Sequence, residues 1–184
     1  MERVYQSILS HLDFDGKGQI LDVGCGSGAL SIRAALVWPQ ARVLGIDAWP
    51  PAYNYSQRMC EKNAESEGVA DLCRFQRGDA NKLDFPDGRF DAVVSNYVYH
   101  NITGADRQAL LLETLRVLKK GGVFALNDEM KPRLYGDMEA FAQKLRDMGY
   151  EDVRLIDTAT EAFGSCRRAA MMMLGASRML VGRK

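Results

Sequence analysis

Closely spaced glycines form the segment of this sequence best suited to contact a ligand. The run is Ile20-Leu21-Asp22-Val23-Gly24-Cys25-Gly26-Ser27-Gly28-Ala29-Leu30. Glycine lets the backbone turn tightly and lets a ligand approach the main chain, and free N–H groups at a helix start favour negative charge. Gly24-x-Gly26-x-x-Ala29 also satisfies the dinucleotide fingerprint. The segment therefore predicts a ligand-binding turn, with a nicotinamide or flavin coenzyme as one candidate and a ligand-free connection as the alternative.

Acidic and small residues follow the next apolar stretches of the chain. Asp47 ends Val43-Leu44-Gly45-Ile46-Asp47, where a carboxylate can accept both ribose hydroxyls of an adenosine. Asp79, between Gly78 and Ala80, can accept a bond from an adenine amino group and leave room for the ring. Asn96 ends the next apolar stretch, Phe90-Asp91-Ala92-Val93-Val94-Ser95-Asn96. We expect these positions to meet at one edge of a sheet.

Each carboxylate also has a structural interpretation. Asp22 can cap the turn that follows it, and Asp47 can cap the segment before Pro50-Pro51. Asp79 can form an Asx-turn with Asn81. Asp91 precedes the fourth strand, away from the ligand edge, and is interpreted as structural.

The elements that must position these residues alternate between short apolar stretches and longer amphipathic ones, which is typical of βαβ units. Strands are predicted at 19–23, 42–46, 73–76, 92–95, 122–127, 152–157 and 178–182. Helices are predicted at 5–12, 29–36, 55–67, 105–118 and 136–148. We expect the helix 105–118 to lie on a sheet face and to stop at Lys119-Lys120-Gly121-Gly122. The pattern predicts an α/β fold with one open, mostly parallel seven-stranded sheet and an antiparallel last strand.

Composition excludes several classes of protein. The chain has 184 residues and a formal net charge of +0, which fits one globular domain and argues against binding through many phosphates. Cys25, Cys60, Cys73 and Cys166 show no CxxC pairing and there are 2 histidines, so no metal site is expected. There is no run of roughly 18 apolar residues and no secretion signal, so we expect no membrane span and a cytoplasmic location.

From about Ile20 to Lys184 the chain resembles the class I S-adenosylmethionine-dependent methyltransferases. The resemblance implies a Rossmann-like, doubly wound sheet, with residues 1–184 as one methyltransferase domain, 1–18 as a short N-terminal cap segment and 19–184 as the cofactor-binding part. The stretches 115–124 and 179–184 look like the family's passage into its fifth strand and its antiparallel last strand. The implied cofactor is S-adenosylmethionine, with S-adenosylhomocysteine as product. The implied cofactor-binding residues are Asp22, Gly24, Cys25, Gly26, Gly28, Asp47, Ala48, Trp49, Gly78, Asp79, Ala80 and Asn96. Trp49 covers the adenine or packs under Pro50-Pro51.

Candidate catalytic residues follow the fourth strand. Methyl transfer is an in-line displacement in which the protein aligns the acceptor and sometimes removes its proton. Tyr97 and Tyr99 can direct ring faces or hydroxyls at the transferring centre, or serve as pocket walls. His100 suits a general base at neutral pH, and the alternative is that it caps or packs at the next helix.

The sequence gives little information about the methyl acceptor. Because no Asn-Pro-Pro-Tyr or Asp-Pro-Pro-Tyr motif follows the fourth strand, a nucleic-acid substrate is not expected and a small-molecule acceptor is preferred. A macromolecular acceptor, protein or RNA, is the alternative, followed by an NAD-dependent oxidoreductase and a non-catalytic cofactor-binding protein. The segment 158–176, with Met171, Met172 and Met173, packs on the sheet or lines an acceptor pocket. We expect a monomer or weak homodimer.

Overall fold

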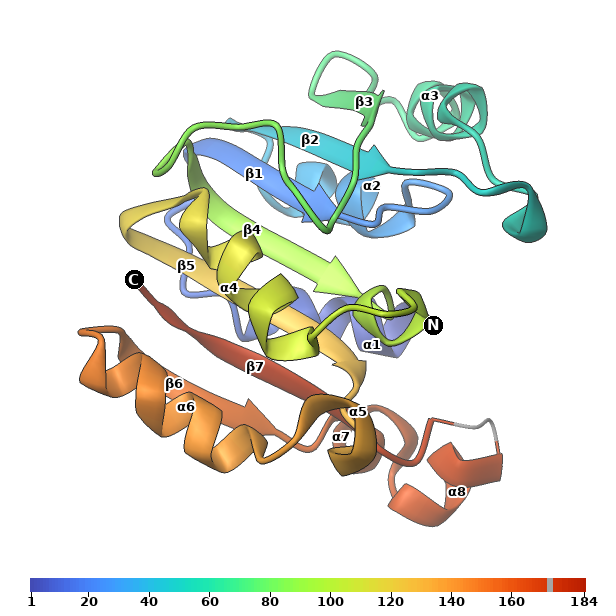
Figure 1. Cartoon of the computed structure of the whole chain (residues 1–184). Helices are drawn as coiled ribbons and strands as arrows, with labels where there is room; N and C mark the ends of the chain where they lie inside the picture. The colour runs from blue at the N-terminus through green and yellow to red at the C-terminus, as the bar shows by residue number, and fades with distance from the viewer. Residues whose placement is uncertain (172–173) are drawn as a thin grey trace.

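Seven strands form one mixed sheet in the computed structural model, which describes residues 1–171 and 174–184 (Figure 1). They are β1 (Gly18–Val23), β2 (Ala41–Asp47), β3 (Cys73–Arg77), β4 (Phe90–Asn96), β5 (Leu118–Glu129), β6 (Glu151–Ile156) and β7 (Ser177–Arg183). Their order across the sheet is β3-β2-β1-β4-β5-β7-β6. β7 pairs antiparallel with β5 and β6, and the remaining pairs are parallel. The predicted fold class and the antiparallel last strand are confirmed.

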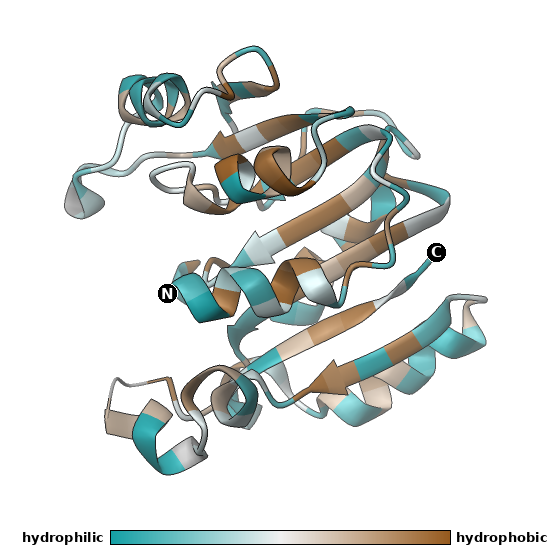
Figure 2. Ribbon diagram, turned by 180° about the vertical axis from the view of Figure 1, so that it is seen from behind, coloured by the Kyte–Doolittle hydropathy of each residue, from teal (hydrophilic) through white to brown (hydrophobic). Residues whose placement is uncertain are grey.

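Helices cover both faces of this sheet, because alternate residues of a buried strand point to opposite sides. Val94 of β4 belongs to the apolar cluster on one face, and its neighbour Val93 belongs to the cluster on the other. The first face carries α1 (Glu2–Ser10), α2 (Ala29–Val37), α3 (Gln57–Ser66) and α7 (Thr158–Phe163). The second carries α4 (Arg107–Arg116), α5 (Pro132–Tyr135) and α6 (Met138–Asp147). Brown strands lie between the helices in Figure 2, as expected for a sheet buried on both faces.

Side-chain caps explain where several helices begin. The carboxylate of Asp106 accepts bonds from the backbone N–H groups of Gln108 and Ala109, which have no partner within the helix. Asp137 caps α6 in the same way through Ala140, and Ser56 caps α3 through Met59. These caps set the starts of α4, α6 and α3 two residues inside the predicted ranges.

The predicted end of the helix 105–118 is wrong. α4 ends at Arg116, and Lys119 to Gly122 already belong to β5. Leu118 pairs with Phe90 of β4, and the register then shifts before Val123 pairs with Ala92. Pairing with a neighbouring strand therefore overrides the helix-ending signal carried by the two lysines and the two glycines.

The segment 158–176 divides into two short helices. Thr158, Ala159 and Ala162 of α7 are buried, and Ala162 joins the apolar cluster under α1 and α2. α8 (Cys166–Met171) follows, and the Met171 side chain is exposed. Met172 and Met173 lie outside the described residues. For α7, packing on the sheet is the interpretation that the structure supports.

Neither a membrane-spanning helix nor a metal-binding cluster is found among the described residues. None of their helices is long and apolar enough to cross a membrane. No group of three or more His, Cys, Asp or Glu side chains among them is arranged to hold a metal ion. Cys25, Cys60 and Cys73 are free and buried thiols.

Candidate active site

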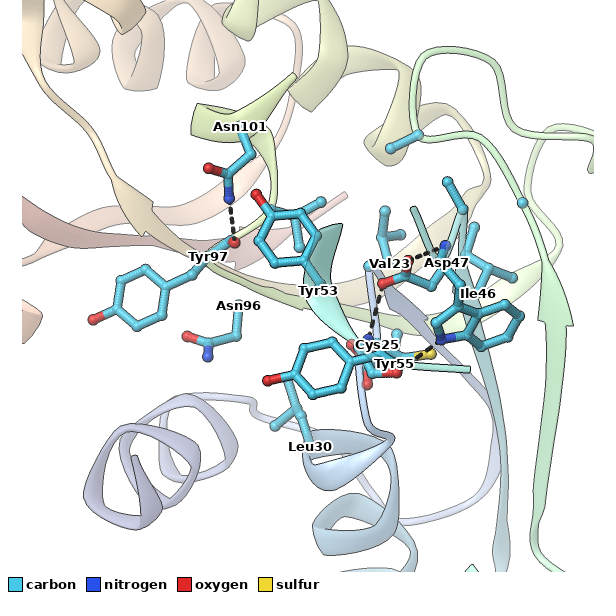
Figure 3. A pocket seen from close by; sticks show the side chains of 18 of the residues that line it. Val23, Cys25, Leu30, Ile46, Asp47, Tyr53, Tyr55, Asn96, Tyr97 and Asn101 are labelled. Atoms are coloured by element: carbon cyan, nitrogen blue, oxygen red, sulfur yellow. Dashed lines mark hydrogen bonds between the residues drawn. The ribbon is translucent and has the colours of Figure 1, made fainter. Parts of the chain in front are cut away.

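A cavity of about 490 Å³ opens at the carboxyl ends of the central strands (Figure 3). The chain leaves β1 towards β2 on one side and later returns to β4 on the other, so the strand order reverses at this point. Open α/β sheets bind their ligands at such a reversal, because the loops diverge there and leave a crevice. The loops after β1, β2, β3 and β4 all contribute to the cavity wall. The topology thus brings together the residues that the sequence places at four separate strand ends.

The glycine turn after β1 forms the floor of this cavity. Gly24, Gly26 and Gly28 all have positive φ, at 72°, 57° and 81°. The N–H groups of Gly24 and Cys25 donate to the carbonyl oxygen of Ile46, at 2.8 and 3.0 Å, which ties the turn to β2. Gly24, Cys25 and Gly26 line the cavity, but Gly28 does not. Gly28 is instead the N-cap of α2 and faces Phe75 and Cys60, so its expected ligand contact is replaced by a packing role.

Asp47 holds two loops together at the tip of β2. One carboxylate oxygen accepts the N–H of Gly26 at 2.9 Å, and the other accepts the N–H of Trp49 at 2.6 Å. Each oxygen can accept more than one bond, so capacity for two hydroxyl donors remains. The indole N–H of Trp49 donates to the carbonyl oxygen of Gly26 at 2.8 Å, and its side chain is buried while also lining the cavity. Asp47 and Trp49 therefore brace the glycine turn as well as face the ligand space.

Asp79 forms an Asx-turn with Asn81, which is the structural role considered for it from the sequence. Its Oδ1 accepts both the backbone and the side-chain N–H of Asn81, at 2.8 and 2.7 Å. These bonds lower the pKa of the Asp79 carboxyl. Asp79 also lines the cavity with Gly78 and Ala80, and Oδ2 remains for a ligand. Both interpretations of this residue are thus compatible.

Asp22 is a buried acid beside the ligand space. Its side chain is 1% exposed and accepts a hydrogen bond from the Ser31 hydroxyl at 2.6 Å. Burial raises the pKa of Asp22 from 3.8 to about 7, because the charged carboxylate loses its hydration, although the Ser31 bond opposes the shift. Asp22 therefore changes charge near neutral pH at the wall of the cavity.

Asn96 and Tyr97 lie where β4 ends. The Asn96 side-chain oxygen accepts a bond from the Asn127 amide at 2.8 Å, and the Tyr97 hydroxyl shares a bond with Ser177 at 2.7 Å. Tyr97 has φ of 56°, an uncommon value for a residue other than glycine. Both residues line the cavity. Tyr97 is therefore part of the cavity wall, and its contact with a transferring centre stays a prediction.

Tyr99 and His100 do not line the cavity, in contrast to Tyr97. Tyr99 is completely buried on the opposite face of the sheet and its hydroxyl bonds Thr114 at 2.9 Å, so the expected contact with a transferring centre is corrected to a core position. The Nδ1 atom of His100 binds the buried carboxylate of Asp128, which also accepts the Tyr135 hydroxyl at 2.8 Å. Of the two interpretations of His100, this placement favours the packing one.

We expect His100→Ala to lower the free energy of unfolding by about 2 kcal/mol, because Asp128 is completely buried and loses a charge-assisted partner. Turnover with an accepted substrate and cofactor affinity should each stay within about threefold. Urea unfolding and steady-state rates check this result. A fall in turnover of roughly 10²–10⁴-fold with unchanged stability would instead identify His100 as a general base.

Several cavity residues were not anticipated as site residues. Tyr5 of α1 reaches the cavity, consistent with the expected covering segment, and Tyr53 and Tyr55 enter from the loop after β2. Two tyrosines within four residues after Pro50-Pro51 were an available signal, since exposed aromatic residues in a loop beside a strand tip often serve binding. Val98, Asn101 and Ile102 line the cavity because the chain turns sharply at Tyr97.

Comparisons of the sequence with known proteins identify methyltransferases among its relatives. A family model described as a methyltransferase domain matches residues 21–126. Demethylmenaquinone methyltransferase of Symbiobacterium thermophilum is 33% identical over 135 residues, which cover 71% of this chain and 50% of that protein. Fatty-acid O-methyltransferase of Mycolicibacterium smegmatis is 34% identical over 131 residues, covering 71% and 43%. The chain thus spans about half the length of these curated relatives, or less.

A solved structure shares the fold over most of its length. Geranyl diphosphate methyltransferase in complex with SAM superposes with a TM-score of 0.70 at 18% identity, covering 97% of this chain and 83% of that one. At this identity the likeness concerns the arrangement of the elements. The assignment of individual residues therefore depends on the cavity itself.

Proposed function

We propose that this chain, which belongs to the methyltransferase-domain family, transfers a methyl group from S-adenosylmethionine to a small-molecule acceptor. The observation that carries the proposal is the cavity at the strand reversal, where the glycine turn, Asp47 and the Gly78-Asp79-Ala80 loop converge. Curated relatives named for quinone and fatty-acid substrates support a small-molecule acceptor. Protein and RNA acceptors remain outcomes of the test below.

The cavity residues fit this cofactor. A Cβ on Gly26 would meet nothing nearer than the Tyr55 ring at 3.6 Å, so the main chain there is open to a ligand. Asp47 would accept the ribose hydroxyls, Asp79 the adenine amino group, and Ala48, Trp49 and Ala80 would bound the ring. Asp22 would offer negative charge to the methionine part, beside Gly24, Cys25 and Asn96. When bound, the cofactor supplies an electrophilic methyl group on a sulfonium.

The chain's own contribution is positioning and exclusion of water. Hydrogen bonds from Gly24 and Cys25 to Ile46 and from Gly26 to Asp47 fix the turn before any ligand arrives. Preorganisation of this kind lowers the entropic cost of bringing two reactants into line. Tyr5 and Met1 bring α1 to the cavity and cover part of it.

Replacing Asp47 with alanine tests the cofactor assignment. We expect Asp47→Ala to weaken the binding of S-adenosylmethionine and S-adenosylhomocysteine by on the order of 1.5–3 kcal/mol, because two charge-assisted bonds to the ribose are lost. Isothermal calorimetry measures this change, and NAD should not bind to either protein.

Asp91→Ala is the matched control. Asp91 also accepts a backbone N–H, from Gln19 at 2.8 Å, and pairs with Lys119, but it lies at the amino end of β4. This variant should lose stability and keep cofactor affinity. Equal losses of affinity in the two variants would remove the ribose assignment, and tight NAD binding would restore the oxidoreductase hypothesis. Formation of S-adenosylhomocysteine with fractionated metabolites, proteins and RNA then identifies the acceptor class.

A further inference from the structure

Four tyrosine side chains line the cavity. Tyr5, Tyr53, Tyr55 and Tyr97 all line it, although they come from α1, the short helix η1 (Pro51–Tyr53), the loop before α3 and the end of β4. In Figure 3 the Tyr53 and Tyr55 rings lie on one side of Asn96 and the Tyr97 ring on the other. Burial raises the pKa of Tyr5, and the nearby Asp22, Tyr55 and Tyr97 add to the effect. We call these four lining residues the tyrosine cluster (Tyr5, Tyr53, Tyr55 and Tyr97).

Negatively charged groups outnumber positively charged ones around the cavity. Its lining carboxylates are Asp22, Asp47 and Asp79, and the described lining residues include no lysine, arginine or histidine side chain; the cation among them is the N-terminal ammonium of Met1. A carboxylate or phosphate on the acceptor would lose its hydration here and meet three carboxylates, with no cationic side chain in return. Tyrosine ring faces carry negative potential, and aromatic cages hold ammonium groups by this attraction. The electrostatics thus favour a positively charged or chargeable acceptor.

The lining carboxylates that could take a proton from a hydroxyl acceptor are assigned to the cofactor in the proposed function. Burial raises the pKa of the Tyr5 and Tyr97 phenols, which keeps both protonated at neutral pH. Asp22 is 1% exposed, accepts the Ser31 hydroxyl and is assigned to the methionine part of the cofactor. Asp47 and Asp79 are assigned to the ribose and the adenine, and His100 is turned towards Asp128. An alcohol needs proton removal at the moment of attack, whereas an amine exposes its lone pair once its proton has left to water. An amine therefore matches this cavity better than an alcohol does.

We propose that the tyrosine cluster is the acceptor subsite and that the acceptor is an amine; this inference rests on the proposed function. The amine enters as an ammonium ion held by the ring faces and releases one proton to solvent at the cavity mouth. Its nitrogen then forms a bond to the methyl carbon while the carbon–sulfur bond breaks and that electron pair stays on sulfur. The positive charge passes from sulfur to nitrogen, where the same rings stabilise it.

Binding of charged and uncharged isosteres tests the subsite without turnover. Phenyltrimethylammonium and its neutral isostere tert-butylbenzene are titrated into the protein saturated with S-adenosylhomocysteine. We expect the cation to bind roughly 3- to 30-fold more tightly, the range that cation–π contacts supply. Equal affinity for the two probes would overturn the proposal.

Ring and hydroxyl contributions are separated by paired substitutions. Tyr53 and Tyr55 are 49% and 46% exposed, so their replacement should leave the fold intact. Tyr55→Leu should lower the affinity for phenyltrimethylammonium about 3- to 10-fold. Tyr55→Phe keeps the ring, so its affinity should stay within about twofold of the parent. Tyr150→Leu is the control, because Tyr150 packs beside Phe124 at 6.1 Å between ring centroids and does not line the cavity. Equal losses in the Leu and Phe variants would assign the effect to the hydroxyl and overturn the cation–ring contact.

A matched acceptor series completes the test. Phenethylamine, 2-phenylethanol and phenylacetate share a skeleton and differ in the reacting group. We expect S-adenosylhomocysteine to form faster with the amine than with the other two. If S-adenosylhomocysteine binds but the ammonium probe and the amine show no preference, the subsite inference fails and the proposed function stands. If S-adenosylhomocysteine does not bind, the proposed function itself fails.

Discussion

Replacing Asp22 with asparagine is expected to stabilise the fold at pH 8 by up to about 4 kcal/mol while weakening binding of S-adenosylmethionine. The pKa of this buried carboxyl rises from 3.8 to about 7, and each unit corresponds to about 1.4 kcal/mol. The folded protein binds this proton more tightly than the unfolded chain, so the contribution of Asp22 to stability falls as pH rises from about 4 to about 7. Above pH 7 the Asp22 carboxylate is charged and the whole cost of its desolvation is present. The neutral amide of the Asp22→Asn variant removes this cost.

Urea unfolding of both proteins at pH 4, 6 and 8 measures this prediction. The difference between Asp22→Asn and the parent should be near zero at pH 4 and grow to its full size at pH 8. A difference that is the same at all three pH values would show that desolvation of the charge is not its source. Asp91→Asn is the control, because the Asp91 carboxylate is partly exposed and pairs with Lys119.

The same ionisation predicts a pH dependence of binding. S-adenosylmethionine carries positive charge on its amino and sulfonium groups, which favours the charged form of Asp22. Affinity should therefore fall as pH drops through about 7, and Asp22→Asn should bind more weakly with a flat profile. Calorimetry between pH 6 and pH 8 tests this. If the affinity of the parent protein were as independent of pH as that of the variant, the charge of Asp22 would make no contribution to cofactor binding.

Gly24→Ala is expected to lower stability by roughly 2–5 kcal/mol and turnover by about 100-fold. The φ of Gly24 is +72°, and an added Cβ would lie 2.2 and 2.5 Å from the two methyl groups of Val98. The turn cannot move freely to relieve this contact, since the Gly24 N–H donates to the carbonyl oxygen of Ile46. The substitution therefore adds overpacking to backbone strain.

Two further variants separate these causes. Gly68 has a similar φ of +71° but no atom within 4 Å of an added Cβ, so Gly68→Ala reports strain alone, about 1 kcal/mol. Val98→Ala removes the clashing methyl groups, and the double variant Gly24→Ala/Val98→Ala should recover roughly 1–3 kcal/mol relative to additivity. If Gly24→Ala costs no more than Gly68→Ala, the clash with Val98 plays no part.

The sequence by itself determined the sheet and the strand-end residues that meet at the cavity. Buried parallel strands need apolar runs of a few residues, so β1, β2 and β3 lie within a residue or two of their predicted positions. Residues that follow such strands must meet at the carboxyl edge of the sheet, which placed Asp47, Asp79 and Asn96 around one cavity. These inferences need only local pattern and the topology of βαβ units.

Tertiary structure alone decided which side chains of the turn after β4 face that cavity. Tyr97, Tyr99 and His100 are close in sequence, yet only Tyr97 lines it, because the left-handed backbone at Tyr97 turns the chain and Asp128 captures His100. The tyrosine cluster likewise joins segments up to ninety-two positions apart, from Tyr5 to Tyr97. Side-chain direction in an irregular turn depends on partners supplied by distant strands, and local sequence carries no periodicity from which to infer them.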